Sequence, residues 1–215
     1  MESLNLNVAA IVLAGGRGSR FGSFKPSHVV SGRTLLEYLL IAIRPLYKEI
    51  MIVVGTELQR KQIQRQMEGL TIITDRVSGV GPLGGILTGA SCTHEEYCQI
   101  LPADSPLPNR RILNYLAASV NAHDAVVPVW PDGRVEPLHG IYRAKTAAKE
   151  AECLIARGEY AVISLVRSLK AHPINIERLQ QFDRDLETFL NVNTREDVDK
   201  IVSALDRQRH ETNQT

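Results

Sequence analysis

The chain has 215 residues, of which 44% are apolar and 23% are charged, and its formal net charge is +1. This length suits one compact domain, and the ordinary composition excludes a disordered or fibrous chain. The near-neutral charge gives no general attraction to nucleic acid or to an anionic membrane, so neither is predicted as a partner and any anion site must be local.

Apolar runs alternate with segments of helical periodicity along the chain. Strands are predicted at 8–13, 50–54, 71–74, 97–101 and 125–129, and the segment 135–142 can form a further strand. Helices are predicted at 34–46, 57–67, 83–91, 109–120, 144–156 and from about 195 to 205. The alternation predicts an α/β fold with a mostly parallel central sheet flanked by helices. We expect one domain over 1–206 and a polar C-terminal tail, 207–215, that frays.

The cysteines and the N-terminus indicate the compartment. Cys92, Cys98 and Cys153 lack C-x-x-C spacing, so neither a disulfide framework nor a zinc site is predicted. The first apolar run is short and has no basic segment before it, which argues against a signal peptide or a membrane span. These features predict a cytoplasmic protein.

The segment 13–26 reads LAGGRGSRFGSFKP and follows the first predicted strand. It is not a P-loop, because Lys25 is followed by Pro26, and Pro26 also disfavours the immediate helix of a dinucleotide-binding loop. A third interpretation is a loop whose glycine amides wrap a triphosphate while Arg17, Arg20 and Lys25 neutralise it. A glycine-rich turn with solvated cations is the alternative.

The segment 101–106, LPADSP, places Asp104 just beyond a predicted strand. Ligands of open α/β sheets bind at this edge, outside the carboxyl ends of the strands. Mg²⁺ commonly uses one or two protein carboxylates together with substrate phosphates. Asp104 is therefore a candidate Mg²⁺ ligand, and the alternative is an Asx-type turn before Pro106.

Two further segments suit a nucleoside. Gly81 begins GPLGG, which opens a helix with little side-chain bulk, so that a base or ribose can approach the backbone. Asp75 ends the preceding strand and can accept a hydrogen bond from a base or a ribose hydroxyl. The alternative for GPLGG is a tight turn with small packing residues, and the alternative for Asp75 is a solvated turn residue.

The segment 189–198 reads FLNVNTREDV. Thr194 and Asp197 fit a helix capping box, with Thr194 as the N-cap. Asn191 and Asn193 alternate on a predicted short strand, so their amides are expected on one face. Two amide oxygens on one face would suit a metal or its bound waters.

LAGGRGSRFG with Lys25, GPLGG, LPADSP, RVEPLHGIYR and FLNVNTREDV, in this order, resemble the molybdenum cofactor guanylyltransferase family. The resemblance covers about residues 8–205, and FLNVNTREDV is its most specific part. It implies a Rossmann-like nucleotidyltransferase fold and an Mg²⁺-dependent enzyme that transfers GMP from GTP to the terminal phosphate of molybdopterin, releasing pyrophosphate. The implied partners are GTP, molybdopterin, and molybdoenzymes or cofactor-chaperone proteins.

The resemblance also assigns roles to individual residues. It implies Arg17, Lys25 and Asp104 as catalytic groups, with Asp104 also binding the metal. The residues implied to bind the nucleotide or its metal are Leu13, Ala14, Gly15, Gly16, Lys25, Asp75, Gly81, Asn191 and Asn193.

The chain departs from the family pattern at several positions. Family members often carry an asparagine at the end of the strand that matches 50–54, where this chain has Val54-Gly55-Thr56, and a proline where it has Arg195. His139 lies in the looser match RVEPLHGIYR. It either faces the pterin or has a structural role, and we favour the structural role. Arg143 and Arg167 are either pterin-side cations or solvated side chains.

Alternative functions stay open. The same motifs suit a cytidylyltransferase for this cofactor, or a guanylyltransferase for a cobinamide phosphate or a phospholactate. A nucleotide-binding chaperone that has lost turnover is the alternative outside the enzyme class.

Overall fold

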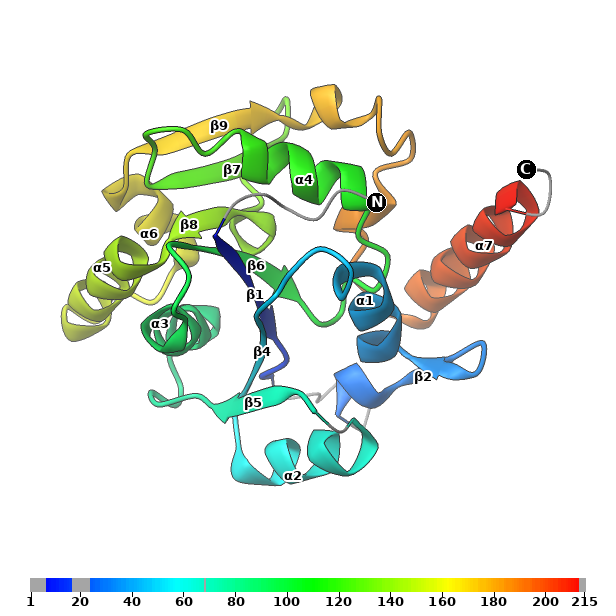
Figure 1. Cartoon of the computed structure of the whole chain (residues 1–215), viewed down its shortest axis with the longest axis horizontal. Coiled ribbons are helices and arrows are strands. Elements are labelled where there is room, and N and C mark those ends of the chain that lie inside the picture. Colours follow the sequence, from blue (N-terminus) through cyan, green and yellow to red (C-terminus); the bar gives the residue numbers. More distant parts are fainter. Residues whose placement is uncertain (1–6, 17–23, 68, 213–215) are drawn as a thin grey trace.

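The computed structural model describes residues 7–16, 24–67 and 69–212. These residues form a central sheet whose strands are β1 (Val8–Leu13), β4 (Ile50–Val54), β5 (Thr71–Thr74), β6 (Tyr97–Pro102), β7 (Ala125–Val129), β8 (Ile141–Arg143) and β9 (Ala171–Asn175). The strand order is β5-β4-β1-β6-β8-β7-β9 (Figure 1). β8 runs antiparallel to β6 and β7, and the other pairs are parallel. The predicted α/β class with a mostly parallel sheet is therefore confirmed.

Helices cover both faces of this sheet (Figure 1). They are α1 (Leu35–Ile43), α2 (Glu57–Gln66), α3 (Pro82–Cys92), α4 (Arg110–Ala118), α5 (Ala144–Ala156), α6 (Val162–Ser168) and α7 (Arg195–Thr212). Short 3₁₀ helices are η1 (Lys25–Ser27), η2 (Pro137–His139), η3 (Ile176–Leu179) and η4 (Glu187–Phe189), and β2 (Val29–Val30) pairs with β3 (Arg33–Thr34) in a separate hairpin.

The side chains of β1 alternate between two hydrophobic cores, as expected for a strand covered on both faces. Val8, Ala10 and Val12 pack in a core with α1, α2 and α4. Ile11 packs in the other core, with α3, α5 and α6. The continuous apolar run that predicted this strand thus reflects burial on both sides.

The segment 135–142, which the sequence offers as a possible strand, differs most from its prediction. It contains η2, and only its last residues join β8. Pro137 explains the difference, because proline has no N–H to donate to a neighbouring strand. The strand prediction for the whole segment is wrong.

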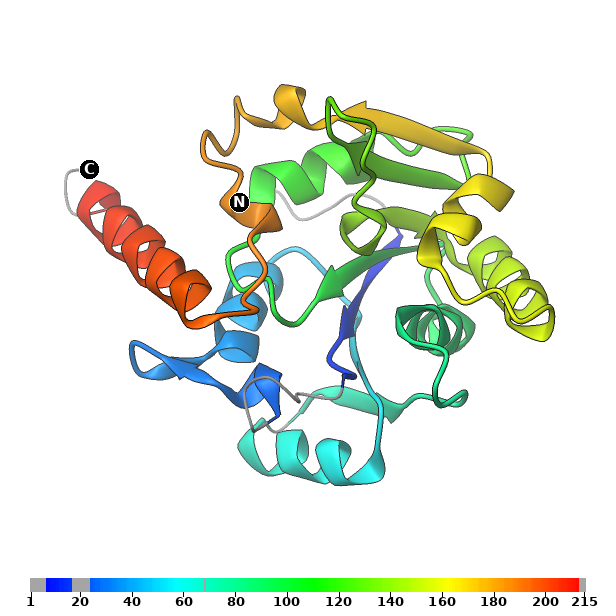
Figure 2. The same cartoon turned by 180° about the vertical axis from the view of Figure 1, so that it is seen from behind.

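The C-terminal helix α7 packs beside α1 and the β2–β3 hairpin. Ile201, Ala204 and Leu205 join Leu35 and Tyr38 in a small third core. Figure 2 shows α7 projecting from the body of the molecule. The helix runs to Thr212, through most of the segment 207–215 that was predicted as a frayed tail. None of the helices in the described part of the chain has the length and apolar content required to cross a membrane.

The sheet order places a topological switch point between β1 and β6. From β1 the chain first adds β4 and β5 on one side and later adds β6 on the other side. The loops that follow β1 and β6 therefore leave the carboxyl edge in neighbouring positions and diverge, which is where ligands bind in open α/β sheets.

Helix α3 lies unusually close to β1, and glycine makes this possible. A Cβ atom on Gly89 would lie 2.5 Å from Cγ2 of Ile11, and one on Gly85 would lie 2.9 Å from Cδ2 of Leu13. Both contacts are far shorter than van der Waals distance. The close packing fixes the N-terminal end of α3, where Gly81 lies.

We expect Gly89→Ala to lower the free energy of unfolding by about 1 to 3 kcal/mol, because the added methyl overpacks a β-branched neighbour. Denaturant unfolding measures the change. Ser91→Ala is the matched control on an exposed position of the same helix and should be neutral or slightly stabilising. Equal stability of the two variants would contradict the packing argument.

Candidate active site

Lys25, Asp104 and Asn193 meet at the carboxyl edge of the sheet, beside the end of β6. The Lys25 ammonium forms an ion pair with the Asp104 carboxylate, and its Nζ donates a hydrogen bond to Oδ1 of Asn193 at 2.9 Å. The side chains of Lys25 and Asp104 are only 18% and 28% exposed, so water screens the pair incompletely. Three residues that are far apart in the sequence are thus brought together as predicted.

Local structure holds Lys25 in this position. It begins η1, where buried Pro26 follows it, and the N–H of His28 donates to its carbonyl oxygen at 3.0 Å. Proline fits the first turn of a helix because its missing N–H would have no partner there. The pair Lys25-Pro26 that argued against a P-loop therefore orients the lysine.

The segment 191–193 is bound to the residues around Asp104. The N–H of Val192, whose side chain is fully buried, donates to the carbonyl oxygen of Asp104 at 2.9 Å. Asn191 accepts a hydrogen bond from the Ser105 hydroxyl. The segment belongs to no strand, so the predicted short strand is wrong. Both amides still reach the Asp104 region because they flank the buried Val192.

The capping box of α7 fixes the backbone on the other side of Asn193. The N–H of Asp197 donates to Oγ1 of Thr194 at 3.2 Å, and the N–H groups of Asn193 and Thr194 donate to Oδ2 of Asp197, both at 2.9 Å. Partial burial acts to raise the pKa of Asp197, but these hydrogen bonds hold it below its ordinary value. The predicted capping box is confirmed.

The residues after β1 lie against the loop after β4. The N–H of Ala14 donates to Val53, and a Cβ on Gly15 would lie 3.1 Å from the backbone nitrogen of Gly55. Gln59 spans both loops: its Nε2 donates to the Gly16 carbonyl at 3.2 Å, and its Oε1 accepts from the Gly55 N–H at 2.9 Å.

Sequence reasoning missed Gln59. The available signal was its place in the first turn of the helix after Gly55. The sequence also predicts that Arg17 and Arg20 neutralise a triphosphate. Both arginines lie outside the described residues.

Asp75 and Gly81 lie beside the N-terminal end of α3. Oδ1 of Asp75 accepts hydrogen bonds from the buried Thr88 hydroxyl at 2.9 Å and from the Val77 N–H at 3.1 Å. Gly81 has φ +67°, in the left-handed region that favours glycine. One oxygen of Asp75 is thus used by the fold, and its nucleoside contact stays a prediction.

The two remaining arginines lie elsewhere. Arg143 pairs with Glu96 and with Asp124 at 3.3 Å, and it lies opposite Tyr97, where β6 begins. Arg143 ends β8, which runs antiparallel to β6, so it lies at the edge of the sheet where β6 begins. Asp104 follows β6 at the opposite edge. Arg167 lines a separate cavity beside β7 and α6. Neither arginine reaches the residues around Asp104.

A cavity of about 370 Å³ adjoins Asp104, Asn191 and Asn193. Its other walls are Pro102, the segment 136–139 and the segment 161–163. His139 lines this cavity from η2 and is 1% exposed. Burial lowers the pKa of His139 to about 4, although contact with the Thr188 backbone acts in the opposite direction.

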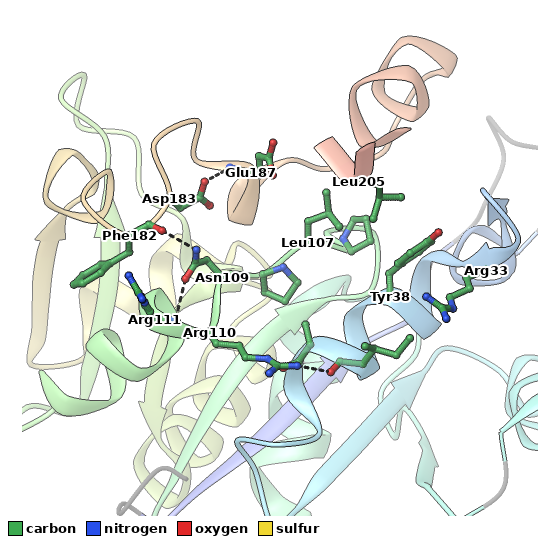
Figure 3. Close-up of a pocket in the computed structure, with 14 residues that line it drawn as sticks. Arg33, Tyr38, Leu107, Asn109, Arg110, Arg111, Phe182, Asp183, Glu187 and Leu205 are labelled. Atoms are coloured by element: carbon green, nitrogen blue, oxygen red, sulfur yellow. Dashed lines mark hydrogen bonds between the residues drawn. The ribbon is translucent and has the colours of Figure 1, made fainter. Parts of the chain in front are cut away.

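A larger cavity of about 820 Å³ lies between α1, the loop after Asp104 and α7 (Figure 3). Two of its polar side chains are already used by the fold. Arg110 donates to the carbonyl oxygens of Ala42 and Ile41, and Asn109 donates to that of Phe182. None of the predicted site residues lines it, so the cavity beside Asp104 is the better candidate for a substrate.

Residues 10–173 match the MobA-like NTP transferase domain. The chain belongs to this family. A probable molybdenum cofactor guanylyltransferase of Pyrococcus furiosus is 35% identical, and the match covers 90% of this chain and 96% of the relative. Another probable molybdenum cofactor guanylyltransferase, from Methanosarcina mazei, is 30% identical, and the match covers 90% of this chain and 89% of the relative. Family membership makes the chain a nucleotidyltransferase, as the resemblance implied.

Solved structures of other proteins share the fold. Molybdopterin-guanine dinucleotide biosynthesis protein A from Archaeoglobus fulgidus is 26% identical, with a TM-score of 0.81 over 93% of this chain and 99% of that one. A cytidylyltransferase from Thermus thermophilus has a TM-score of 0.65 at 16% identity, and the match covers 92% of this chain and 98% of that one. At this identity it supports the fold alone. The Rossmann-like nucleotidyltransferase fold is confirmed.

The capping box gives a stability prediction. Thr194→Ala should lower the free energy of unfolding by about 1 kcal/mol, because the Asp197 N–H loses its acceptor. Thermal and denaturant unfolding measure this, with Ser203→Ala on the same helix as the control. A Thr194→Ala variant as stable as the control would show that the box does not stabilise α7.

Proposed function

We propose that this protein transfers GMP from GTP to the terminal phosphate of molybdopterin and releases pyrophosphate. The observation that carries the proposal is the cluster of Lys25, Asp104 and Asn193, of which Asp104 and Asn193 line the cavity beside β6. Family membership and the names of the curated relatives support the same reaction.

The oxygen atoms around Asp104 fit a hard divalent cation such as Mg²⁺. Asp104 supplies a carboxylate, and Asn191 and Asn193 supply amide oxygens. The described residues hold no group of three or more His, Cys, Asp or Glu side chains suited to a metal. This sparse donor set suits Mg²⁺, which takes few protein ligands and completes its shell with substrate phosphates and water. When bound, the cation supplies positive charge to the triphosphate.

The reaction requires alignment and charge neutralisation more than proton transfer. The acceptor phosphate is already an anion, so an oxygen of it attacks the α-phosphorus of GTP without a protein base. The bond from the α-phosphorus to the bridging oxygen breaks, and pyrophosphate leaves with the electron pair. The Lys25 ammonium and the amides of the glycine loop stabilise the charge that develops on pyrophosphate.

The two substrates approach this cluster from opposite sides. The loops after β1, β4 and β5, with Gly15, Gly55 and Asp75, form the side proposed for GTP. The cavity beyond β6 forms the side proposed for the acceptor. Cytoplasmic location and exchange with molybdoenzymes or cofactor chaperones stay predictions from the resemblance.

Replacing the charged pair should separate catalysis from stability. Lys25→Met and Asp104→Asn should each lower kcat by roughly a hundredfold to a thousandfold, as loss of a group that stabilises transition-state charge does. Pyrophosphate release at saturating substrates measures this, and thermal unfolding checks the fold. Lys200→Met, which removes an exposed lysine of α7, is the control. Near-normal kcat in Asp104→Asn would refute the metal assignment.

The choice of nucleotide tests the proposed activity. With molybdopterin as acceptor and Mg²⁺ present, GTP should give a higher kcat/KM than CTP, measured by pyrophosphate release and mass of the product. A preference for CTP would make the protein a cytidylyltransferase. Nucleotide binding without pyrophosphate release, with molybdopterin, cobinamide phosphate or phospholactate, would favour the chaperone alternative.

A further inference from the structure

Two polar side chains in the cavity beside Asp104 have no role in the chemistry described above. Glu136 and His139 line it from the segment at η2, whereas Asp104 and Asn193 line it from the loop after β6 and the segment before α7. Its apolar lining includes Val162 and Ile163. A volume of about 370 Å³ is within the range of small-molecule pockets, which combine apolar walls with a few polar groups.

The Glu136 carboxylate is held firmly by one of its oxygens. Oε1 accepts hydrogen bonds from Nε1 of Trp130 at 2.6 Å and from Nη1 of Arg134 at 3.3 Å. Arg134 in turn stacks over the Trp130 ring, 4.6 Å from its centre. Oε2 lies 4.0 Å from Nδ1 of His139, beyond hydrogen-bond distance, and no described residue donates to it. The carboxylate therefore keeps one acceptor oxygen on the His139 side.

His139 is buried with its polar atoms poorly satisfied. The Thr188 backbone lies near the ring and acts to raise its pKa, but neither ring nitrogen has a partner at hydrogen-bond geometry among the described residues, and the ring packs edge-on against Phe189 with centres 5.0 Å apart. An unsatisfied buried polar group is costly, and in native proteins it calls for an explanation such as a ligand. Because burial keeps the imidazole neutral at pH 7, it offers one donor and one acceptor.

We propose that Glu136 and His139 recognise the ring system of the acceptor, a pterin, while its phosphate lies at the Asp104 end. The inference rests on the proposed function, which supplies the pterin. A pterin has adjacent ring N–H and amino donors, which match a carboxylate oxygen, and a carbonyl that matches the imidazole donor. The apolar walls contact its flat faces.

The guanine base of GTP carries the same ring N–H and amino donors, so it is the other ligand that this cavity could bind. The position of the cavity favours the pterin. It lies beyond β6, beside η2 and α6, whereas Gly15, Gly55 and Gly81 lie on the β1, β4 and α3 side. The tests below separate the two by measuring the acceptor and GTP independently.

Glu136→Gln keeps the size of the side chain and removes its charge. We expect KM for molybdopterin to rise roughly tenfold or more, as loss of a hydrogen bond to a charged group does, with KM for GTP within about twofold of wild type. Asp132→Asn is the matched control, because it neutralises an exposed carboxylate of the same turn outside the cavity. A rise in KM for GTP alone would assign the cavity to guanine and overturn the inference.

His139→Leu and His139→Gln separate recognition from packing. Leucine should raise KM for the acceptor about tenfold while Tm stays equal or rises, because an unpartnered polar group leaves the core. Glutamine, which keeps a donor and an acceptor, should retain more acceptor affinity. A lower Tm with unchanged KM for the acceptor would make His139 purely structural and overturn its part of the proposal.

Direct binding keeps the inference independent of turnover. Trp130 is the only tryptophan of the chain and donates to Glu136, so its fluorescence reports on the cavity. Hydroxymethylpterin phosphate should bind wild type at least about tenfold more tightly than glycerol phosphate, and Glu136→Gln should remove most of this preference.

The outcomes distinguish the two proposals. Equal affinity of wild type for both phosphates overturns pterin recognition, even where GMP transfer proceeds. Pterin preference without GMP transfer from GTP refutes the proposed function and leaves pterin recognition standing.

Discussion

The parallel pairing of β1 with β6 is the constraint on which the site depends. Leu13 lies opposite Pro102, and the N–H of Ala103 donates to the Leu13 carbonyl at 3.0 Å, so both strands end at the same level. Residues 14–16 and the Asp104 loop consequently leave the sheet side by side. Lys25, at the start of η1, pairs there with the Asp104 carboxylate. Without this register the cation and the anion would not meet.

The C-terminal segment completes the cluster by a different means. No strand carries Asn191 and Asn193; instead the buried Val192 and its hydrogen bond to the Asp104 backbone fasten the chain at the site. The capping box then sets where α7 begins, immediately after Asn193. Two local interactions therefore position side chains contributed from the far end of the sequence.

Sequence reasoning succeeded where local pattern and chemistry agree. Apolar runs such as 50–54 and 71–74 have the lengths of buried strands. Asp104 follows another such run, at 97–101, and its carboxylate indicated the edge of the sheet at which the site lies. It identified the two asparagines but assigned them the wrong local structure, because alternation alone does not supply a neighbouring strand. Gln59 was missed because its hydrogen bond to Gly16 joins segments that only the tertiary fold brings together. Glu136 was missed because its hydrogen-bond partners are local and the cavity that it lines with Asp104 forms only in the tertiary fold.

The antiparallel strand β8 explains why the acceptor side carries its own polar groups. An antiparallel strand begins at the edge where its parallel neighbours end, so the residues just before β8 must lie at the carboxyl edge of the sheet. Those residues are η2 and Glu136, and the Ile100 N–H donates to the Gly140 carbonyl at 2.9 Å, which holds the turn against β6. A parallel strand here would have carried them to the opposite edge. The one reversal in the sheet thus brings Glu136 and His139 to the cavity beside Asp104.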